Sequence, residues 1–293
     1  MKITIGIPAF NEEKNIASII TKLRRISDSI IVCNDGSSDM TEEIAKEMGV
    51  IVISHAKNLG YGAAIRSLFE KAREMELDCL ITFDADNQHR IEDINSIFQP
   101  INDGTADIVI GSRFLSETTE DMPSYRKAGI RLITKVTNLS IKEKLTDSQS
   151  GFRAYNKKAL KEILVSDEGM GVSTEILIKG SDLGLKMAEI PIKINYEGET
   201  STHHPVSHGT SVIVSTLKFT SISHPLKFWG IPGIILLGVG FIFMFISFQN
   251  LGFDRDIFTN YALVGIGGLV LGSIMVMTSA ILYTIVSVVR EKN

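Results

Sequence analysis

The stretch that decides the fold is Cys79-Leu80-Ile81-Thr82-Phe83-Asp84-Ala85-Asp86-Asn87-Gln88-His89. Its apolar first half is rich in strand-forming residues and predicts a buried β-strand that stops at two carboxylates. In an open α/β sheet, ligands bind outside the carboxyl ends of the strands. Asp84 and Asp86 repel each other, and a divalent cation between them and a phosphate-bearing ligand relieves that repulsion. The stretch therefore predicts a site for Mg²⁺ or Mn²⁺ and a diphosphate, with oxygen ligands from Asp84, Asp86 and Gln88.

The same residues have a simpler interpretation. One aspartate could cap the helix predicted to begin near Ile91, and the other could be merely solvated. An isolated Asp-x-Asp pattern is common by chance and favours this alternative. The position of the pair at a strand end, and the polar residues that follow other strands, favour the metal site. His89 would then reach the sugar or diphosphate, or orient a metal ligand.

Strands and helices alternate on both sides of this stretch. Short apolar runs predict strands at 3–10, 29–33, 50–53, 79–83, 107–110 and 186–196, with a short strand after the turn at 147–153. Periodic segments predict helices at 11–26, 41–48, 62–75, 91–101, 124–139, 156–164 and 174–183, the first of them capped by Asn11. Such alternation is typical of an α/β protein with a mostly parallel, doubly wound sheet flanked by helices.

Polar residues gather after the predicted strands. Because the carboxyl ends of parallel strands meet at one edge of a sheet, we expect these residues to form a nucleotide-binding site there. They are Asn11 and Glu12 after the first strand, Asp35 after the second, Asp84 and Asp86 after the fourth, and Arg113 after the fifth, and the apolar Pro8, Phe10 and Ala85 beside them are expected to belong to the same site. The segment 58–62 looks like part of a glycine-rich phosphate loop, but a loop-to-helix turn is the preferred interpretation.

Composition narrows the class of protein. The net charge is −4 and no basic run stands out, which argues against nucleic acid as a partner. Cys33 and Cys79 both fall in predicted buried strands, so we expect two reduced core thiols and a reducing compartment. The first apolar run, 3–10, is short and contains Pro8, which is unlike a signal peptide.

The carboxyl-terminal part reads as a membrane hairpin. No charged residue occurs between Lys227 and Asp254 or between Asp256 and Arg290, and each stretch exceeds the roughly 20 residues that cross a bilayer. We expect helices at about 228–250 and 261–289, within a hairpin unit at 228–293. Its glycines, such as Gly265, would allow close helix packing and, through it, an oligomer.

Three further expectations concern topology. A catalytic domain at 1–200 would be followed by an amphipathic segment at 201–227 on the membrane surface. The segment's three histidines, His203, His204 and His208, are expected to be solvated or to face lipid headgroups rather than to bind metal. Positive residues flank the hairpin and its connecting loop is net negative, so the catalytic domain and both termini of this multi-pass protein of the cell membrane should be cytoplasmic.

Five segments carry a family resemblance. They are 8–13 (PAFNEE), 34–39 (NDGSSD), 84–89 (DADNQH), 111–113 (GSR) and 150–153 (SGFR). In this order they closely resemble the motifs of family 2 glycosyltransferases, above all the polyprenyl-phosphate (dolichyl-phosphate) mannose and glucose synthases. The resemblance covers about the first two thirds of the chain and implies a GT-A fold. It also implies donor contacts from the first two motifs, a metal held by the third, and an acceptor phosphate near the fourth.

The chain departs from the family pattern in places. Phe10 stands where the family often has tyrosine, Asn34 replaces an acidic residue, and Asn87 replaces a common leucine. Processive polysaccharide synthases of the superfamily carry a Gln-x-x-Arg-Trp motif, whereas the only tryptophan here, Trp229, lies at the membrane boundary. A processive polymerase is therefore disfavoured.

The chemistry fits a lipid-phosphate acceptor. The diphosphate leaving group needs a metal, whereas an acceptor phosphate is already an anion and needs no strong base. Arg113 would pair with that phosphate in bidentate fashion, and Arg126 or Lys127 would add a second cation. The alternative for Arg113 is a salt bridge to a nearby acidic side chain. For Arg126, Lys127 and Arg153 it is a solvated face or a structural ion pair.

These observations predict a metal-dependent enzyme. It would transfer one sugar, with inversion, from a GDP-mannose or UDP-glucose type of donor to a polyprenyl or dolichyl phosphate, giving a lipid-linked sugar for glycan assembly. The alternatives are transfer to a glycan or glycerolipid hydroxyl, which would need a base, and a noncatalytic sugar-nucleotide-binding membrane protein. The sequence names neither the sugar nor the nucleotide.

Overall fold

The computed structural model describes residues 1–115, 122–194, 224–249 and 255–291, with scattered positions between 214 and 222. The chain divides into two compact units, Met1–Leu217 and Lys218–Asn293, which are considered separately. Two expectations lie outside the described residues, namely most of the amphipathic segment with its three histidines, and the connection between the two hairpin helices at 250–254. The predicted three-part division of the chain remains a prediction.

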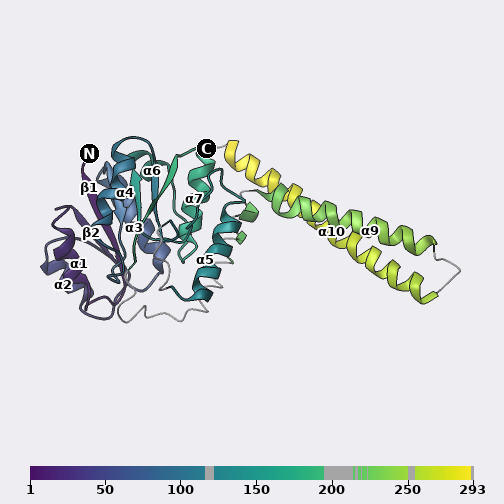
Figure 1. The fold of residues 1–293 in the computed structure, drawn as a ribbon, viewed down its shortest axis with the longest axis horizontal. Helices are drawn as coiled ribbons and strands as arrows, with labels where there is room; N and C mark the ends of the chain where they lie inside the picture. The colour runs from purple at the N-terminus through teal and green to yellow at the C-terminus, as the bar shows by residue number, and fades with distance from the viewer. Residues whose placement is uncertain are drawn as a thin grey trace. The chain divides into compact units, whose positions relative to one another are not determined.

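The first unit is built on one seven-stranded sheet (Figure 1). Its strands are β1 (Ile3–Ala9), β2 (Ile30–Asn34), β3 (Ile51–Ser54), β4 (Cys79–Thr82), β5 (Ile108–Ser112), β6 (Arg153–Asn156) and β7 (Met187–Pro191). They lie in the order β3-β2-β1-β4-β6-β5-β7. Strand β6 runs antiparallel to both of its neighbours, and every other pairing is parallel. The predicted mostly parallel α/β sheet is confirmed.

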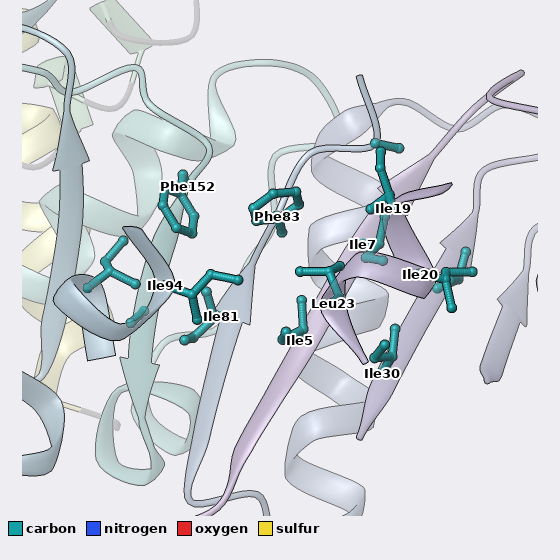
Figure 2. Packing of buried hydrophobic residues seen from close by; sticks show 14 of the residues in the cluster. Ile5, Ile7, Ile19, Ile20, Leu23, Ile30, Ile81, Phe83, Ile94 and Phe152 are labelled. Carbon is teal, nitrogen blue, oxygen red and sulfur yellow. The ribbon is translucent and has the colours of Figure 1, made fainter. Parts of the chain in front are cut away.

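Helices cover both faces of this sheet. Alternate residues of each strand point to opposite faces, so Ile5 and Ile7 of β1 share one core with α1 (Ile16–Leu23), α2 (Thr41–Glu47) and α4 (Asp93–Asn102). Figure 2 shows Ile19, Ile20 and Leu23 of α1 gathered with Ile5, Ile7 and Ile30, and Phe83 beside Phe152. Gly6 faces the other way, where a side chain would meet Leu68 of α3 (Tyr61–Glu74).

The remaining helices of this unit lie towards the later strands. Helices α6 (Lys157–Glu162) and α7 (Val172–Asp182) pack beside α3, and α5 (Ser124–Thr137) packs on α7. Cys33 and Cys79 are buried and free, as expected.

One predicted element is wrong at its start. Helix α1 begins at Ile16 rather than at residue 11, and Asn15 occupies its N-cap position. Asn11 has a left-handed backbone, with φ of 56°, and its side chain accepts a hydrogen bond from the backbone N–H of Ser38 at 2.8 Å. The polar residues that follow β1 therefore tie two strand ends together instead of opening a helix. The other predicted elements begin and end close to their observed bounds, with two exceptions: β7 is shorter, and the last helix, expected from about residue 261, begins at Arg255.

The second unit consists of a short π-helix (Leu226–Gly230), α9 (Ile231–Gln249) and α10 (Arg255–Glu291). Two spans, Leu226–Gln249 and Thr259–Val288, are long and apolar enough to cross a membrane. A Cβ on Gly240 would lie 2.7 Å from the backbone nitrogen of Leu269, and one on Gly268 would lie 3.0 Å from Gly240 Cα. The two helices thus approach each other backbone to backbone, as the glycines predicted.

Candidate active site

Strand β6 brings a distant segment to the carboxyl edge of the sheet. Because β6 is antiparallel to β4, Arg153 at its beginning pairs with Thr82 at the end of β4. The Thr82 hydroxyl donates a hydrogen bond to the carbonyl of Gly151 at 2.6 Å. The segment 150–153 therefore lies beside Asp84, although it stands at the beginning of its strand, whereas the other site residues follow theirs.

Asp84 is held by side chains from two other elements. The Tyr61 hydroxyl donates to its Oδ1 at 3.1 Å, and His89 Nε2 lies 3.2 Å from its Oδ2. A Cβ on Gly151 would come within 2.7 Å of Oδ2 and 2.5 Å of the Tyr61 hydroxyl, so only glycine fits there. Burial acts to raise the pKa of Asp84, but the His89 and Tyr61 contacts and the charge of Arg113 outweigh it and lower the pKa. Asp84 is thus a fixed carboxylate.

Asp86 is held less firmly. Its Oδ1 accepts a hydrogen bond from the backbone N–H of Gln88 at 3.1 Å. Burial, followed by the negative charge of Asp84, raises the pKa of Asp86. Glu12 belongs to the same group of carboxylates, because burial raises its pKa and Asp86, Asp39 and Asp84 raise it further. A cation among these carboxylates would relieve both effects.

The donor set fits a hard divalent cation. Asp84 and Asp86 offer carboxylate oxygens, and Gln88, two residues after Asp86, is buried; their binding of a metal remains a prediction. Among the described residues no three His, Cys, Asp or Glu side chains already form a metal-binding group. Further ligands would therefore come from other oxygens, such as those of a diphosphate. The capping alternative is wrong, since α4 begins at Asp93 with no side-chain hydrogen bond at its cap.

The ends of β1 and β2 are joined by hydrogen bonds. Asn11 bonds to the 37–38 turn, and the backbone N–H of Glu12 donates to the Thr41 hydroxyl at 2.8 Å. Pro8 and Ala85 are buried at the same edge, and Phe10 is half-buried. The structure thus assembles the predicted donor-binding residues of these two strands with the carboxylates of β4, and their contacts to a donor remain predictions.

Asp35 carries a partner that the sequence interpretation missed. Its side chain lies 2.6 Å from His55 Nδ1, and it accepts hydrogen bonds from the backbone N–H groups of Leu59 at 3.0 Å and Gly60 at 2.8 Å. Gly60, with φ of 102°, is the N-cap of α3, which confirms the loop-to-helix interpretation of 58–62. His55 directly follows β3, so the rule that polar residues gather after the strands also applies to it and could have indicated it.

Arg113 is buried in a bidentate ion pair. Its Nε lies 2.6 Å from Asp147 Oδ2, and its Nη2 lies 2.8 Å from Oδ1. Burial acts to raise the pKa of Asp147, and the Arg113 guanidinium outweighs it and holds that pKa below its usual range. The salt bridge weighed as an alternative is therefore present. Contact of Arg113 with an acceptor phosphate remains a prediction.

Two cations nevertheless act on the carboxylate pair. The charge of Arg113 helps to lower the pKa of Asp84, and that of Arg126 on α5 partly opposes the rise that burial and Asp84 cause in the pKa of Asp86. Lys127, the next residue of α5, is half-buried. The structure brings the predicted acceptor cations Arg113 and Arg126 to the predicted metal site.

Two other buried charged side chains hold the backbone segments around the site. Arg153, 1% exposed, donates to the carbonyls of Ser148, Ser150 and Ser173, so it holds the segment that carries Gly151. The Glu175 side chain accepts from the backbone of residues 166 and 167. The carbonyl of Glu168 in turn accepts from the N–H of Gly62 at 2.9 Å. Arg153 therefore has a structural role through backbone carbonyls, and this differs from both the solvated face and the ion pair that were weighed for it.

Comparison with known proteins gives the same assignment. The model of the family described as "Glycosyl transferase family 2" matches residues 4–164, which include all five motifs. The chain belongs to this family. A relative from Methanococcus voltae, UDP-N-acetylglucosamine–dolichyl-phosphate N-acetylglucosaminyltransferase, is 35% identical over 229 residues, 71% of this chain and 89% of that protein. A dolichyl-phosphate hexose transferase from Haloferax volcanii is 30% identical over 218 residues, covering 74% of this chain and 92% of that protein.

A solved structure supports the GT-A fold. Glucosyl-3-phosphoglycerate synthase from Mycobacterium tuberculosis, in complex with Mn²⁺ and UDP-glucose, superposes with a TM-score of 0.56 at 22% identity. The match covers 75% of this chain and 79% of that protein. At this identity the likeness concerns the fold, and the family assignment rests on the sequence relatives. The protein is a glycosyltransferase.

Proposed function

We propose that this glycosyltransferase moves a single sugar from a nucleotide-diphosphate sugar to a polyprenyl or dolichyl phosphate, with inversion of the anomeric configuration. The observation that carries the proposal is that carboxylates and cations occur together at the carboxyl ends of the strands. Asp84 and Asp86 offer metal ligands, and the charges of Arg113 and Arg126 act on those carboxylates. The carboxylates would bind the metal of a donor diphosphate, and the cations would bind an anionic acceptor. The names of the two dolichyl-phosphate transferases are in keeping with that acceptor.

The mechanism follows from the charges. A Mg²⁺ or Mn²⁺ ion bound by Asp84, Asp86 and Gln88 would supply charge for the leaving diphosphate. Tyr61 and His89 hold Asp84 in place for this task. Arg113, oriented by Asp147, would contact the acceptor phosphate, with Arg126 or Lys127 as a second cation. The phosphate oxygen attacks the anomeric carbon from the face opposite the diphosphate, so one displacement inverts that centre.

The membrane spans suit a lipid acceptor. Two helices are long and apolar enough to cross a membrane, which is in keeping with an acceptor whose phosphate lies at the bilayer surface. In this proposal the catalytic domain and both termini face the cytoplasm, where nucleotide sugars are made. The sugar itself stays open, because the two named relatives transfer different classes of sugar.

An acceptor panel tests the proposal. Purified full-length protein in detergent is incubated with Mn²⁺, a panel of labelled UDP- and GDP-sugars, and one of three lipids. We expect label to enter the lipid fraction with polyprenyl phosphate and not with free polyprenol or diacylglycerol. Transfer to polyprenol or diacylglycerol without transfer to polyprenyl phosphate would contradict it. The alternative hydroxyl acceptor would then stand.

A further inference from the structure

The carboxylate of Asp35 has one acceptor position left. A carboxylate offers about four lone-pair sites, two on each oxygen. Oδ1 accepts from the Leu59 N–H at 3.0 Å and is contacted by His55 Nδ1 at 2.6 Å, while Oδ2 accepts from the Gly60 N–H at 2.8 Å. Since a carboxylate only accepts, His55 Nδ1 carries the proton. Oδ1 is therefore full, and Oδ2 can accept one more hydrogen bond.

His55 is itself held on its other side. Its Nε2 lies 2.8 Å from the Ser67 hydroxyl of α3, and its side chain is 10% exposed. The ring therefore cannot swing away from Asp35 without losing a second contact. A Cβ on Gly36 would lie 2.3 Å from the backbone carbon of Lys57, so the two turns around Asp35 pack backbone to backbone. The geometry of the carboxylate is fixed from three directions.

Chain continuity connects Asp35 with the candidate metal site. The N–H of Gly60 contacts Asp35, and the hydroxyl of the next residue, Tyr61, contacts Asp84. A nucleoside diphosphate joins a base to a diphosphate through one ribose. A donor whose diphosphate lies at Asp84 and Asp86 can therefore extend along this turn and present its base to Asp35.

We propose that His55 selects the base of the donor, limiting Asp35 to a single ligand hydrogen bond and thereby favouring uracil over guanine. Uracil presents one imide N–H between two carbonyls, which matches one open acceptor position. Guanine presents adjacent N1–H and N2–H donors, which pair best with both oxygens of a carboxylate. With Oδ1 full, one guanine donor would be buried without a partner. This inference rests on the proposed function, because it takes the ligand to be a nucleotide-diphosphate sugar.

Nucleotide binding tests the inference without turnover. The affinities of UDP and GDP for the full-length protein are measured by calorimetry with Mn²⁺. Wild-type protein should bind UDP at least about tenfold more tightly than GDP, as expected for one unpaired buried donor. His55→Phe keeps an aromatic ring but opens a position on Oδ1, so the preference should fall by about tenfold.

Two further variants separate selection from structure. His55→Asn places an amide N–H near the former Nδ1–H and should restore most of the preference for UDP. Ser67→Ala removes the hydroxyl partner of Nε2, leaves the Cys33 thiol 3.8 Å from that nitrogen, and should leave the preference unchanged. Equal losses of UDP and GDP affinity in His55→Phe would make His55 merely structural and overturn the inference.

The outcomes also separate this inference from the proposed function. Equal or tighter binding of GDP by the wild-type protein overturns the base selection but leaves a nucleotide donor in place. A clear preference for UDP without transfer to polyprenyl phosphate supports the base selection and contradicts the proposed acceptor. Binding of neither nucleotide overturns both.

Discussion

Gly151 packs against both Tyr61 and Asp84, and Gly151→Ala is therefore a sharp perturbation of the predicted metal site. The new Cβ would lie 2.5 Å from the Tyr61 hydroxyl and 2.7 Å from Asp84 Oδ2, where ordinary contacts begin at 3.4 Å. Both groups must therefore shift, by up to roughly an ångström, at a cost of about 1–3 kcal/mol for overpacking. Both sides of the Tyr61–Asp84 hydrogen bond face the new methyl group. The damage should consequently fall on the orientation of Asp84.

The assay is a Mn²⁺ titration in the presence of UDP, with free Mn²⁺ followed by electron paramagnetic resonance. Loss of support behind a metal ligand typically weakens metal affinity about 10–100-fold, and we expect Gly151→Ala to fall in this range. Gly129→Ala in α5 is the matched control, since a Cβ there meets nothing within 4 Å. It should bind Mn²⁺ as the wild-type protein does. Unchanged Mn²⁺ affinity in Gly151→Ala would refute the assignment of Asp84 as a supported metal ligand.

Four other outcomes follow from the structure. Asp147→Ala should lower the free energy of unfolding by about 3–5 kcal/mol in chemical denaturation, because it removes the carboxylate that pairs with the buried Arg113 guanidinium. The double variant Arg113→Met, Asp147→Leu replaces both charges and should lower the free energy of unfolding much less. Since Arg113 lowers the pKa of Asp147 in the folded protein, the stability that the ion pair contributes should be complete above about pH 4 and be lost as pH falls through the lowered pKa of Asp147. The free energy of unfolding of Asp147→Asn should lack this pH-dependent loss. Arg113→Lys should slow transfer while UDP affinity stays near wild type; a matching loss of UDP affinity would move Arg113 to the donor side. Finally, a membrane-impermeant thiol reagent on intact cells should label Asn250→Cys and not Leu164→Cys. Labelling of the native cysteines should be weak, because burial raises the pKa of both thiols to about 12. Labelling at position 164 would reverse the proposed topology.

The sheet could be predicted because its strands are separate apolar runs. Periodicity also placed most helices, and the position of Asp84 and Asp86 after β4 located the site. The start of α1 was missed because Asn11 and Glu12 have the residue types of a helix beginning. Their hydrogen bonds go instead to residues 37–41, and sequence spacing carries no information on such a partner.

The supporting residues could not be predicted for a similar reason. Asp147 and Arg113 are 34 positions apart, and Tyr61 and Asp84 are 23 apart, so only the folded sheet makes them neighbours. The antiparallel direction of β6 carries Gly151 to the site, whereas alternation alone favoured parallel strands. Local patterns thus identified the groups at the strand ends, and tertiary contacts decided which of them were already paired.

The central claim is that Asp84 and Asp86 hold a metal that drives sugar transfer to a lipid phosphate. The most direct measurement is the rate of sugar-lipid formation from polyprenyl phosphate and the preferred nucleotide sugar, with Mn²⁺ or with chelator, for the wild-type protein and Asp86→Ala. We expect product from the wild-type protein with Mn²⁺ only, and almost none from Asp86→Ala although its thermal unfolding stays cooperative. Equal rates for the two proteins, or an undiminished wild-type rate in chelator, would contradict the claim.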